Sequence, residues 1–211
     1  MIFGAIAAIG QTNIKRLIAY SSIGHVGYTL AGLATGTNEG IQSSIIYITI
    51  YIVMNLALFS GLLMLRRNNQ YHEDIEDLSG LSKNHPVLAF TMMIILFSLA
   101  GIPPLAGFFA KFYIFMSVIE SNMFTLAIVG LVTTVISAFY YIRIIKVMYF
   151  DDPKKSFERF TDYRIHGPII ISCILLISFF LYPSFLNDIA VSYTHLRAHE
   201  TREDRVWRGG G

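Results

Sequence analysis

Long apolar stretches recur along this chain and are separated by short polar segments. Residues 14–35, 41–65, 124–150 and 168–186 are each almost continuously apolar. The hydrocarbon core of a bilayer is about 30 Å thick, so a helix needs about 20 apolar residues to cross it. Each of these stretches therefore predicts a transmembrane helix. Residues 1–10 are apolar but too short to cross, and they predict the end of a span whose beginning is missing, so we expect the chain to be a fragment.

The stretch 86–120 is too long for one straight span and short for two, and Gly101, Pro103 and Pro104 interrupt it. If it counts as one span, all the basic loops fall on the same side of the membrane, as the positive-inside rule expects. The pattern therefore favours one discontinuous helix. Transporters place such breaks at binding sites, because non-helical backbone inside a bilayer is tolerated where it lines a cavity or is buried in protein. A proline kink that only shapes the helix is the alternative.

Together these patterns predict an all-α fold, a polytopic transmembrane helical bundle whose membrane domain covers residues 1–190. Composition agrees, since 54% of the residues are hydrophobic and 14% are charged, against roughly 25% charged in ordinary globular chains. The net charge of +2 is too small, and its basic residues too scattered, for a nucleic-acid-binding protein. The single cysteine, Cys173, excludes a disulfide framework and a thiolate metal cluster. We expect no metal or cofactor site in this chain, which has no phosphate-binding loop or dinucleotide fingerprint.

The last segment, residues 191–211, differs in composition from the rest of the chain. It contains no Ile, Phe, Lys or Asn, which crowd the preceding sequence, and it holds four Arg and the only Trp. Residues 192–201 (SYTHLRAHET) look like translated sequencing-adapter read-through. We therefore expect this tail to be non-native and exclude it from the fold.

Polar residues inside the predicted spans are the candidate functional residues, because a charge at the bilayer centre costs about 2.5–3.5 kcal/mol. Lys111 follows the break within an apolar sequence, and a lysine held there can take up and release a proton. A lysine that extends its ammonium to the interface is the alternative. His25 is central in residues 14–35, and a histidine hydrogen-bonded to a neighbouring helix is the alternative there.

Polar side chains also recur on one face of three predicted spans. These faces carry Lys15, Ser21, Ser22, His25, Tyr28 and Thr29; then Ser44, Tyr47, Tyr51 and Asn55; then Thr133, Ser137, Tyr140 and Tyr141. Their helical spacing predicts a shared hydrated interior that resembles a proton-relay path, or hydrogen bonds that join the helices. Glycines at Gly24, Gly27, Gly32 and Gly36 predict close helix packing.

Three sequence blocks carry a resemblance to a known family. Residues 11–28 (QTNIKRLIAYSSIGHVGY) closely resemble a signature of the antiporter-like membrane subunits of respiratory complex I, NADH:quinone oxidoreductase. Residues 98–113 (SLAGIPPLAGFFAKFY) look like the broken helix of its subunit N, and residues 76–81 (EDLSGL) are also typical of that subunit. The related subunit M usually carries glutamate at the position of Lys111, which favours N. The resemblance covers residues 1 to about 190.

The resemblance implies that this chain is the C-terminal part of the subunit, with its second inverted repeat and final helix. It implies that Lys111 corresponds to the lysine of the second broken helix, and that Lys15 and His25 correspond to polar residues of a central hydrophilic axis. The glutamate–lysine pair and the central lysine of the family's earlier half are not in this sequence.

We accordingly expect a multi-pass membrane subunit of a proton-translocating NADH:quinone oxidoreductase (a translocase of the respiratory chain), which couples electron transfer to quinone to proton transport. NADH, flavin, iron–sulfur clusters and quinone would bind to partner subunits, and other complex I membrane subunits and the lipid bilayer would be its partners. The location would be a bacterial cell inner membrane or the mitochondrial inner membrane. The alternative function is a subunit of a cation/proton antiporter.

Overall fold

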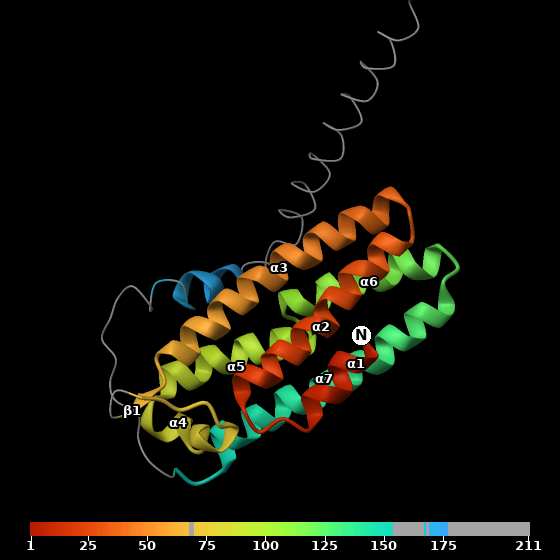
Figure 1. Cartoon of the computed structure of the whole chain (residues 1–211). Helices are drawn as coiled ribbons and strands as arrows, with labels where there is room; N and C mark the ends of the chain where they lie inside the picture. The colour runs from red at the N-terminus through yellow and green to blue at the C-terminus, as the bar shows by residue number, and fades with distance from the viewer. Residues whose placement is uncertain (68–69, 154–166, 168, 177–211) are drawn as a thin grey trace, which may run out of the picture.

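The computed structural model of the chain describes residues 1–67, 70–153, 167 and 169–176, and it is a bundle of α-helices (Figure 1). Its α-helices are α1 (Ile2–Ile9), α2 (Ile14–Ala34), α3 (Asn38–Leu63), α4 (Leu81–Asn84), α5 (Pro86–Ala100), α6 (Ala106–Glu120) and α7 (Phe124–Phe150). Between α3 and α4 lie the 3-10 helix η1 (Ile75–Leu78) and two antiparallel two-residue strands, β1 (Arg66–Arg67) and β2 (Gln70–Tyr71). The predicted all-α bundle is confirmed, apart from this small hairpin.

The long helices run side by side along one axis, and α6 continues from α5 within the bundle (Figure 1). One end of the bundle, the loop end, carries residues 64–85 and 151–153; there Gly80 N–H donates to the carbonyl of Val147 at 3.2 Å. The other, the turn end, carries the turns at residues 35–37 and 121–123, where Thr35, Glu39 and Glu120 line one cavity. Because α5 starts at the loop end and α6 finishes at the turn end, the two cross the bundle once, as one discontinuous helix.

The break in this helix is held by backbone geometry at its two edges. Gly101 ends α5 in the left-handed region with φ of 82°, and its N–H donates to the carbonyls of Phe97 and Ser98. The short segment that follows contains the cis peptide bond between Pro103 and Pro104. At the start of α6, Gly107 N–H donates to Ser98 Oγ at 3.1 Å, and a β-carbon on Gly107 would overlap the Ser98 carbonyl oxygen. The first turn of α6 therefore packs directly against the last turn of α5.

The outer surfaces of the helices are apolar, as a bilayer requires. α3 and α7 are each long and apolar enough to cross a membrane, with mean hydropathies of 2.0 and 1.9. Large apolar side chains are exposed on both of them, including Ile52 on α3 and Val135 on α7. Water-facing surfaces rarely carry so much contiguous apolar area, so the described bundle is a membrane protein with its polar side chains turned inward.

Two sequence predictions about the turn between α2 and α3 need correction. Gly32 does pack closely, since a β-carbon there would overlap Ser44 Oγ on α3, but Gly36 does not. Gly36 lies in the turn itself with φ of 67°, where a residue without a β-carbon is favoured. In addition, α3 begins at Asn38 rather than at the predicted residue 41, because Thr37 caps it by accepting the Gly40 N–H.

Part of the predicted organisation lies outside the described residues. Residues 169–176 are helical and bury Ile169, Cys173 and Leu176, but the rest of the predicted span 168–186 is not among them. The tail at residues 191–211 lies wholly outside the described part as well. The division into a membrane domain at residues 1–190 and a non-native tail therefore stays a prediction.

Candidate functional site

Lys111 lies inside the bundle and joins the two halves of the discontinuous helix. It is on α6, its side chain is 4% exposed, and its Nζ donates to the carbonyl oxygens of Leu99 at 3.0 Å and Ala100 at 3.2 Å. These carbonyls belong to the last turn of α5, where the oxygens have no partner within the helix and carry partial negative charge. The alternative interpretation required the ammonium to extend to the membrane interface. Instead, the lysine caps a helix end inside the protein.

The surroundings of the Lys111 ammonium are neutral apart from these dipoles. None of the ion pairs in the described part of the chain includes Lys111. The nearest aromatic partner is Tyr28 on α2, whose ring centroid lies 5.3 Å from Nζ. A cation over an aromatic ring is stabilised by about 0.5–2 kcal/mol, with the larger values in water-free sites. Two carbonyl oxygens and one ring face therefore compensate this buried charge.

His25 forms the centre of a second buried cluster. Its Nδ1 lies 2.7 Å from the hydroxyl of Tyr47 on α3, and its Nε2 lies 3.2 Å from the hydroxyl of Tyr141 on α7. The ring also stacks on Tyr51, with 4.5 Å between centroids. Since His25 is 2% exposed, both ring nitrogens obtain their hydrogen bonds from protein groups. The histidine thus joins three helices through two phenols.

The hydroxyl groups continue beyond His25 along the interface between α2 and α7. Tyr141 hydroxyl lies 2.5 Å from Ser21 Oγ, and Tyr140 hydroxyl donates to the same Ser21 Oγ at 3.0 Å. One unbroken series of hydrogen bonds therefore runs from Tyr140 through Ser21, Tyr141 and His25 to Tyr47. Such a series can pass a proton from group to group, because each member can both donate and accept.

Tyr28 contacts both the histidine cluster and Lys111. Its ring meets the rings of His25 and Tyr47 edge to face, with centroid distances of 6.1 and 5.9 Å. Its hydroxyl lies 3.1 Å from Thr133 Oγ1 and receives a hydrogen bond from Thr134 Oγ1 at 3.0 Å. The ring is consequently fixed to α7 at its hydroxyl end.

Most of the predicted polar positions meet in this interior. Side chains from all three predicted faces lie in the two clusters: Ser21, His25, Tyr28, Tyr47, Tyr51, Thr133, Tyr140 and Tyr141. Ser44 joins helices instead, since its hydroxyl donates to the Thr29 and Gly40 carbonyls. These hydrogen bonds join α2, α3 and α7, as one of the two interpretations predicted, and the proton relay stays a prediction.

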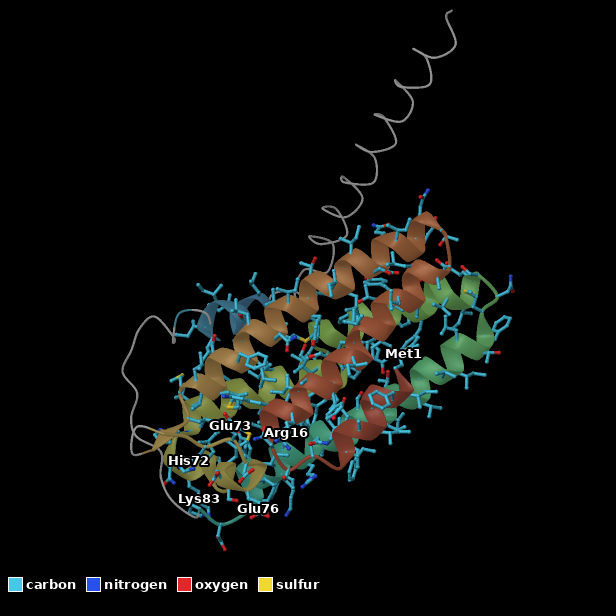
Figure 2. The ribbon with its side chains drawn as sticks, viewed as in Figure 1. Met1, Arg16, His72, Glu73, Glu76 and Lys83 are labelled. Atoms are coloured by element: carbon cyan, nitrogen blue, oxygen red, sulfur yellow. The ribbon has the colours of Figure 1, made fainter. Side chains whose placement is uncertain are left out.

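Lys15 lies apart from these clusters, at the loop end. Its Nζ lies 2.6 Å from Glu73 Oε1, and Asn13 Nδ2 donates to Glu73 Oε2 at 3.1 Å. Figure 2 shows Glu73 and Arg16 together at this end of the bundle. Lys15 precedes His25 by ten helical positions, which corresponds to about 15 Å of rise. The structure therefore brings His25 and Lys111 into neighbouring clusters but not Lys15.

The environment of Glu73 also shows what sequence reasoning missed. Glu73 ties this loop to the start of α2 through Lys15, Asn13 and its own carbonyl, which accepts Ile14 N–H at 2.7 Å. The hydrogen bonds from Lys15 and then Asn13 lower the pKa of the Glu73 carboxyl below its ordinary value of 4.5. Sequence reasoning also missed the groups that accept hydrogen bonds from Lys111. They are backbone carbonyls, and only the break in the helix indicated their presence.

Comparison with known proteins identifies the family. Residues 1–137 match the family described as NADH:quinone oxidoreductase/Mrp antiporter, transmembrane. The chain belongs to this family. One curated relative is NADH-quinone oxidoreductase subunit N of Pelagibacter ubique (strain HTCC1062). It is 66% identical to this chain over 189 residues. That match covers 90% of this chain and 40% of the relative, so the chain spans less than half of the relative's length.

Solved structures agree on the fold. A chain of respiratory complex I from Thermus thermophilus with bound aureothin is 29% identical, with a TM-score of 0.76 over 87% of this chain and 41% of that one. A chain of the Mrp complex from Dietzia sp. DQ12-45-1b is 19% identical, with a TM-score of 0.76 over 89% of this chain and 43% of that one. The second likeness shows the fold alone. The matched family region contains Lys111, His25, Lys15 and the break at Gly101, Pro103 and Pro104.

The described residues include no group of three or more His, Cys, Asp or Glu side chains placed to hold a metal ion. Within the described residues, the buried polar side chains are phenols, hydroxyls, the imidazole of His25 and the ammonium of Lys111. These groups can hold and transfer protons.

Proposed function

We propose that this chain is part of the membrane subunit N of a proton-translocating NADH:quinone oxidoreductase, where it helps to couple electron transfer to quinone to proton transport. The observation that carries the proposal is the buried Lys111 ammonium at the break of the discontinuous helix, beside a hydrogen-bonded series centred on His25. The name borne by the relative that is 66% identical supports the assignment to subunit N.

In this proposal Lys111, His25 and Lys15 are the proton-path residues. Lys111 takes up and releases a proton where the carbonyls of Leu99 and Ala100 can hold its charged form. His25 passes protons through the phenols of Tyr47 and Tyr141. Lys15 acts at the loop end, where its ion pair with Glu73 responds to charge in the adjoining loop. A change in the charge of one group alters the protonation of the next, which links proton movement to events elsewhere in the complex.

The redox chemistry belongs to other subunits in this proposal. NADH, flavin, iron–sulfur clusters and quinone bind to partner chains, and this chain contacts other membrane subunits and lipid. The membrane is the bacterial cell inner membrane, consistent with the bacterial relative, and the mitochondrial inner membrane is the alternative.

A cation/proton antiporter subunit is the second candidate function, because the family description and the Mrp structure include that class. At 19% identity the Mrp chain supports a common fold only, whereas the high identity to a named subunit N favours the oxidoreductase. Purification of the complete subunit from its native membrane distinguishes them. Co-purification with flavin- and iron–sulfur-containing chains supports the oxidoreductase, and a cofactor-free assembly supports the antiporter.

Substitution of Lys111 tests the site itself. The complete subunit carrying Lys111→Ala would be assembled into the oxidoreductase, and NADH-driven proton uptake would be measured in inverted membrane vesicles. We expect proton uptake to fall at least about tenfold while the amount of assembled complex stays near that of the wild type, because the group at the break can no longer be charged. Lys146→Ala is the matched control, since Lys146 is an exposed lysine near the end of α7 that pairs with Asp151. Unchanged proton uptake in Lys111→Ala would contradict the proposal.

A further inference from the structure

The ring of Tyr28 faces the buried charge of Lys111 and is itself held in place from the opposite side. The ring centroid lies 5.3 Å from Lys111 Nζ, while the hydroxyl is hydrogen-bonded to Thr133 and Thr134 on α7. Tyr28 is 3% exposed, so water does not compete for this contact. Tyr28 thereby connects α2, and through its hydroxyl α7, to a charge that also contacts the two halves of the discontinuous helix.

The Lys111 ammonium has three N–H groups, and the backbone of α5 accepts from it at two positions, the carbonyls of Leu99 and Ala100. Within the described residues no carboxylate pairs with it. A buried charge needs compensation from polar or electron-rich neighbours. The electron-rich face of the Tyr28 ring, 5.3 Å from Nζ, provides part of it.

We propose that Tyr28 is a positioning residue for the Lys111 ammonium, and that the negative face of its ring keeps the charged lysine at the C-terminal end of α5. This inference rests on the proposed function, since it specifies how the proton-carrying lysine is held. The same ring meets the His25 ring edge to face at 6.1 Å, so Tyr28 contacts both the lysine and the histidine. Phe115, which meets the edge of the Tyr28 ring at 6.0 Å, supports the ring from the side.

Fluorination of the ring separates an electrostatic role from a packing role. Fluorine withdraws electrons from the ring face and weakens its attraction for a cation, while the shape of the ring changes little. The complete subunit within its assembled complex would carry Tyr28→Phe, and then mono-, di- and trifluorophenylalanine at the same position. We expect NADH-driven proton uptake to fall stepwise with each added fluorine, by about tenfold over the series. The same series at Phe139 is the control, since this phenylalanine is exposed on α7 and no contact with Tyr28 or Lys111 is described for it, and we expect it to be flat.

Each outcome decides the inference. A stepwise fall at position 28 with a flat series at Phe139 supports it. A flat series at position 28, or an equal fall at both positions, overturns the electrostatic role of Tyr28. If Lys111→Ala abolishes proton uptake while the Tyr28 series is flat, only the positioning role is wrong. If Lys111→Ala leaves proton uptake unchanged, the proposed function and this inference are both overturned. Tyr28→Leu, which removes the ring, should lose as much uptake as the trifluorinated variant, and its retention of wild-type uptake would also overturn the inference.

Discussion

The side chain of Lys111 lies against the backbone of Gly101, where a β-carbon would come within 3.1 Å of Lys111 Cδ and 3.3 Å of its Nζ. Gly101 also has a φ of 82°, in the left-handed region. The residue that ends α5 and the lysine that caps α5 therefore share one space, and neither can change without affecting the other.

Gly101→Ala should accordingly impair both stability and proton uptake. A residue with a β-carbon in this backbone conformation costs on the order of 1–3 kcal/mol, and the added methyl group pushes the lysine away from the Leu99 and Ala100 carbonyls. Thermal unfolding of the complete subunit and NADH-driven proton uptake in vesicles measure the two effects. Gly10→Ala is the control, because its φ is −79° and a β-carbon there meets nothing within 4 Å. If Gly101→Ala and Gly10→Ala had the same unfolding temperature and the same proton uptake, the close contact between Gly101 and Lys111 would be refuted.

His25→Phe should reduce proton uptake more than Tyr47→Phe does. The phenylalanine ring can still stack on Tyr51, but both phenols lose their imidazole partner. Tyr141 keeps its bond to Ser21, whereas the Tyr47 hydroxyl loses the bond described for it, and an unsatisfied buried hydroxyl costs about 1–3 kcal/mol. Tyr47→Phe removes the contact at Nδ1 and leaves the one at Nε2. Proton uptake per NADH oxidised is the informative measurement, because it separates transport from electron transfer. A normal ratio in His25→Phe would show that protons do not pass through this cluster.

The ion pair between Lys15 and Glu73 predicts a pH dependence at the loop end. The pKa of the Glu73 carboxyl is lowered in the folded protein, so its contribution to stability is present above the ordinary value of 4.5 and is lost as the pH falls through the lowered value. Glu73→Gln should therefore be less stable than the wild type at neutral pH, by a small amount because the pair is partly exposed. The two proteins should converge in unfolding temperature as the pH falls through this lowered pKa.

Glu120→Gln is the control for this comparison. Glu120 lies at the turn end, and no ion pair described in the structure includes it. Its unfolding temperature should follow that of the wild type across the same pH range. A difference between Glu73→Gln and wild type that persisted unchanged at acid pH would argue against a stabilising charge on Glu73.

Gly32→Ala should loosen the contact between α2 and α3. A β-carbon at Gly32 would overlap Ser44 Oγ and lie 3.0 Å from the Gly40 carbonyl oxygen, and overpacking of this kind costs about 1–3 kcal/mol. Gly24→Ala, in the same helix, has open space around the new β-carbon, and alanine favours a helix over glycine by about 1 kcal/mol. We expect Gly32→Ala to lower the unfolding temperature of the subunit in detergent and Gly24→Ala to leave it equal or higher. A reversed order would contradict the packing.

The sequence predicted those parts of the fold that depend on periodicity and on local chemistry. The discontinuous helix follows from apolar length together with Gly101 and the two prolines, and the polar interior follows from side chains that recur at helical spacing. Long-range partners carry no such signal. Lys15 and Glu73 are 58 positions apart and belong to different elements, so only the folded chain shows that they pair.

The acceptors of Lys111 are backbone carbonyls, which every residue has, so no residue type marks them. Gly36 was misinterpreted for a related reason, because the spacing of glycines along a helix does not reveal that the helix has already ended. The break of a helix can be predicted from its residues, but the direction in which the broken ends face depends on the neighbouring helices.

The hydrogen-bonded series through His25 has a direction. A neutral imidazole offers one N–H and one bare nitrogen, so of the two phenols on its ring one accepts and the other donates. Tyr140 donates to Ser21. If every bond of the series points the same way, Ser21 donates to Tyr141, Tyr141 donates to Nε2 of His25, and Nδ1 of His25 donates to Tyr47. Passage of one proton along this row leaves every hydroxyl turned the opposite way and the ring in its other tautomer. A second proton could follow only after all of them had rotated back, so a proton path through this row, as proposed above, would pass one proton at a time and need a reset after each.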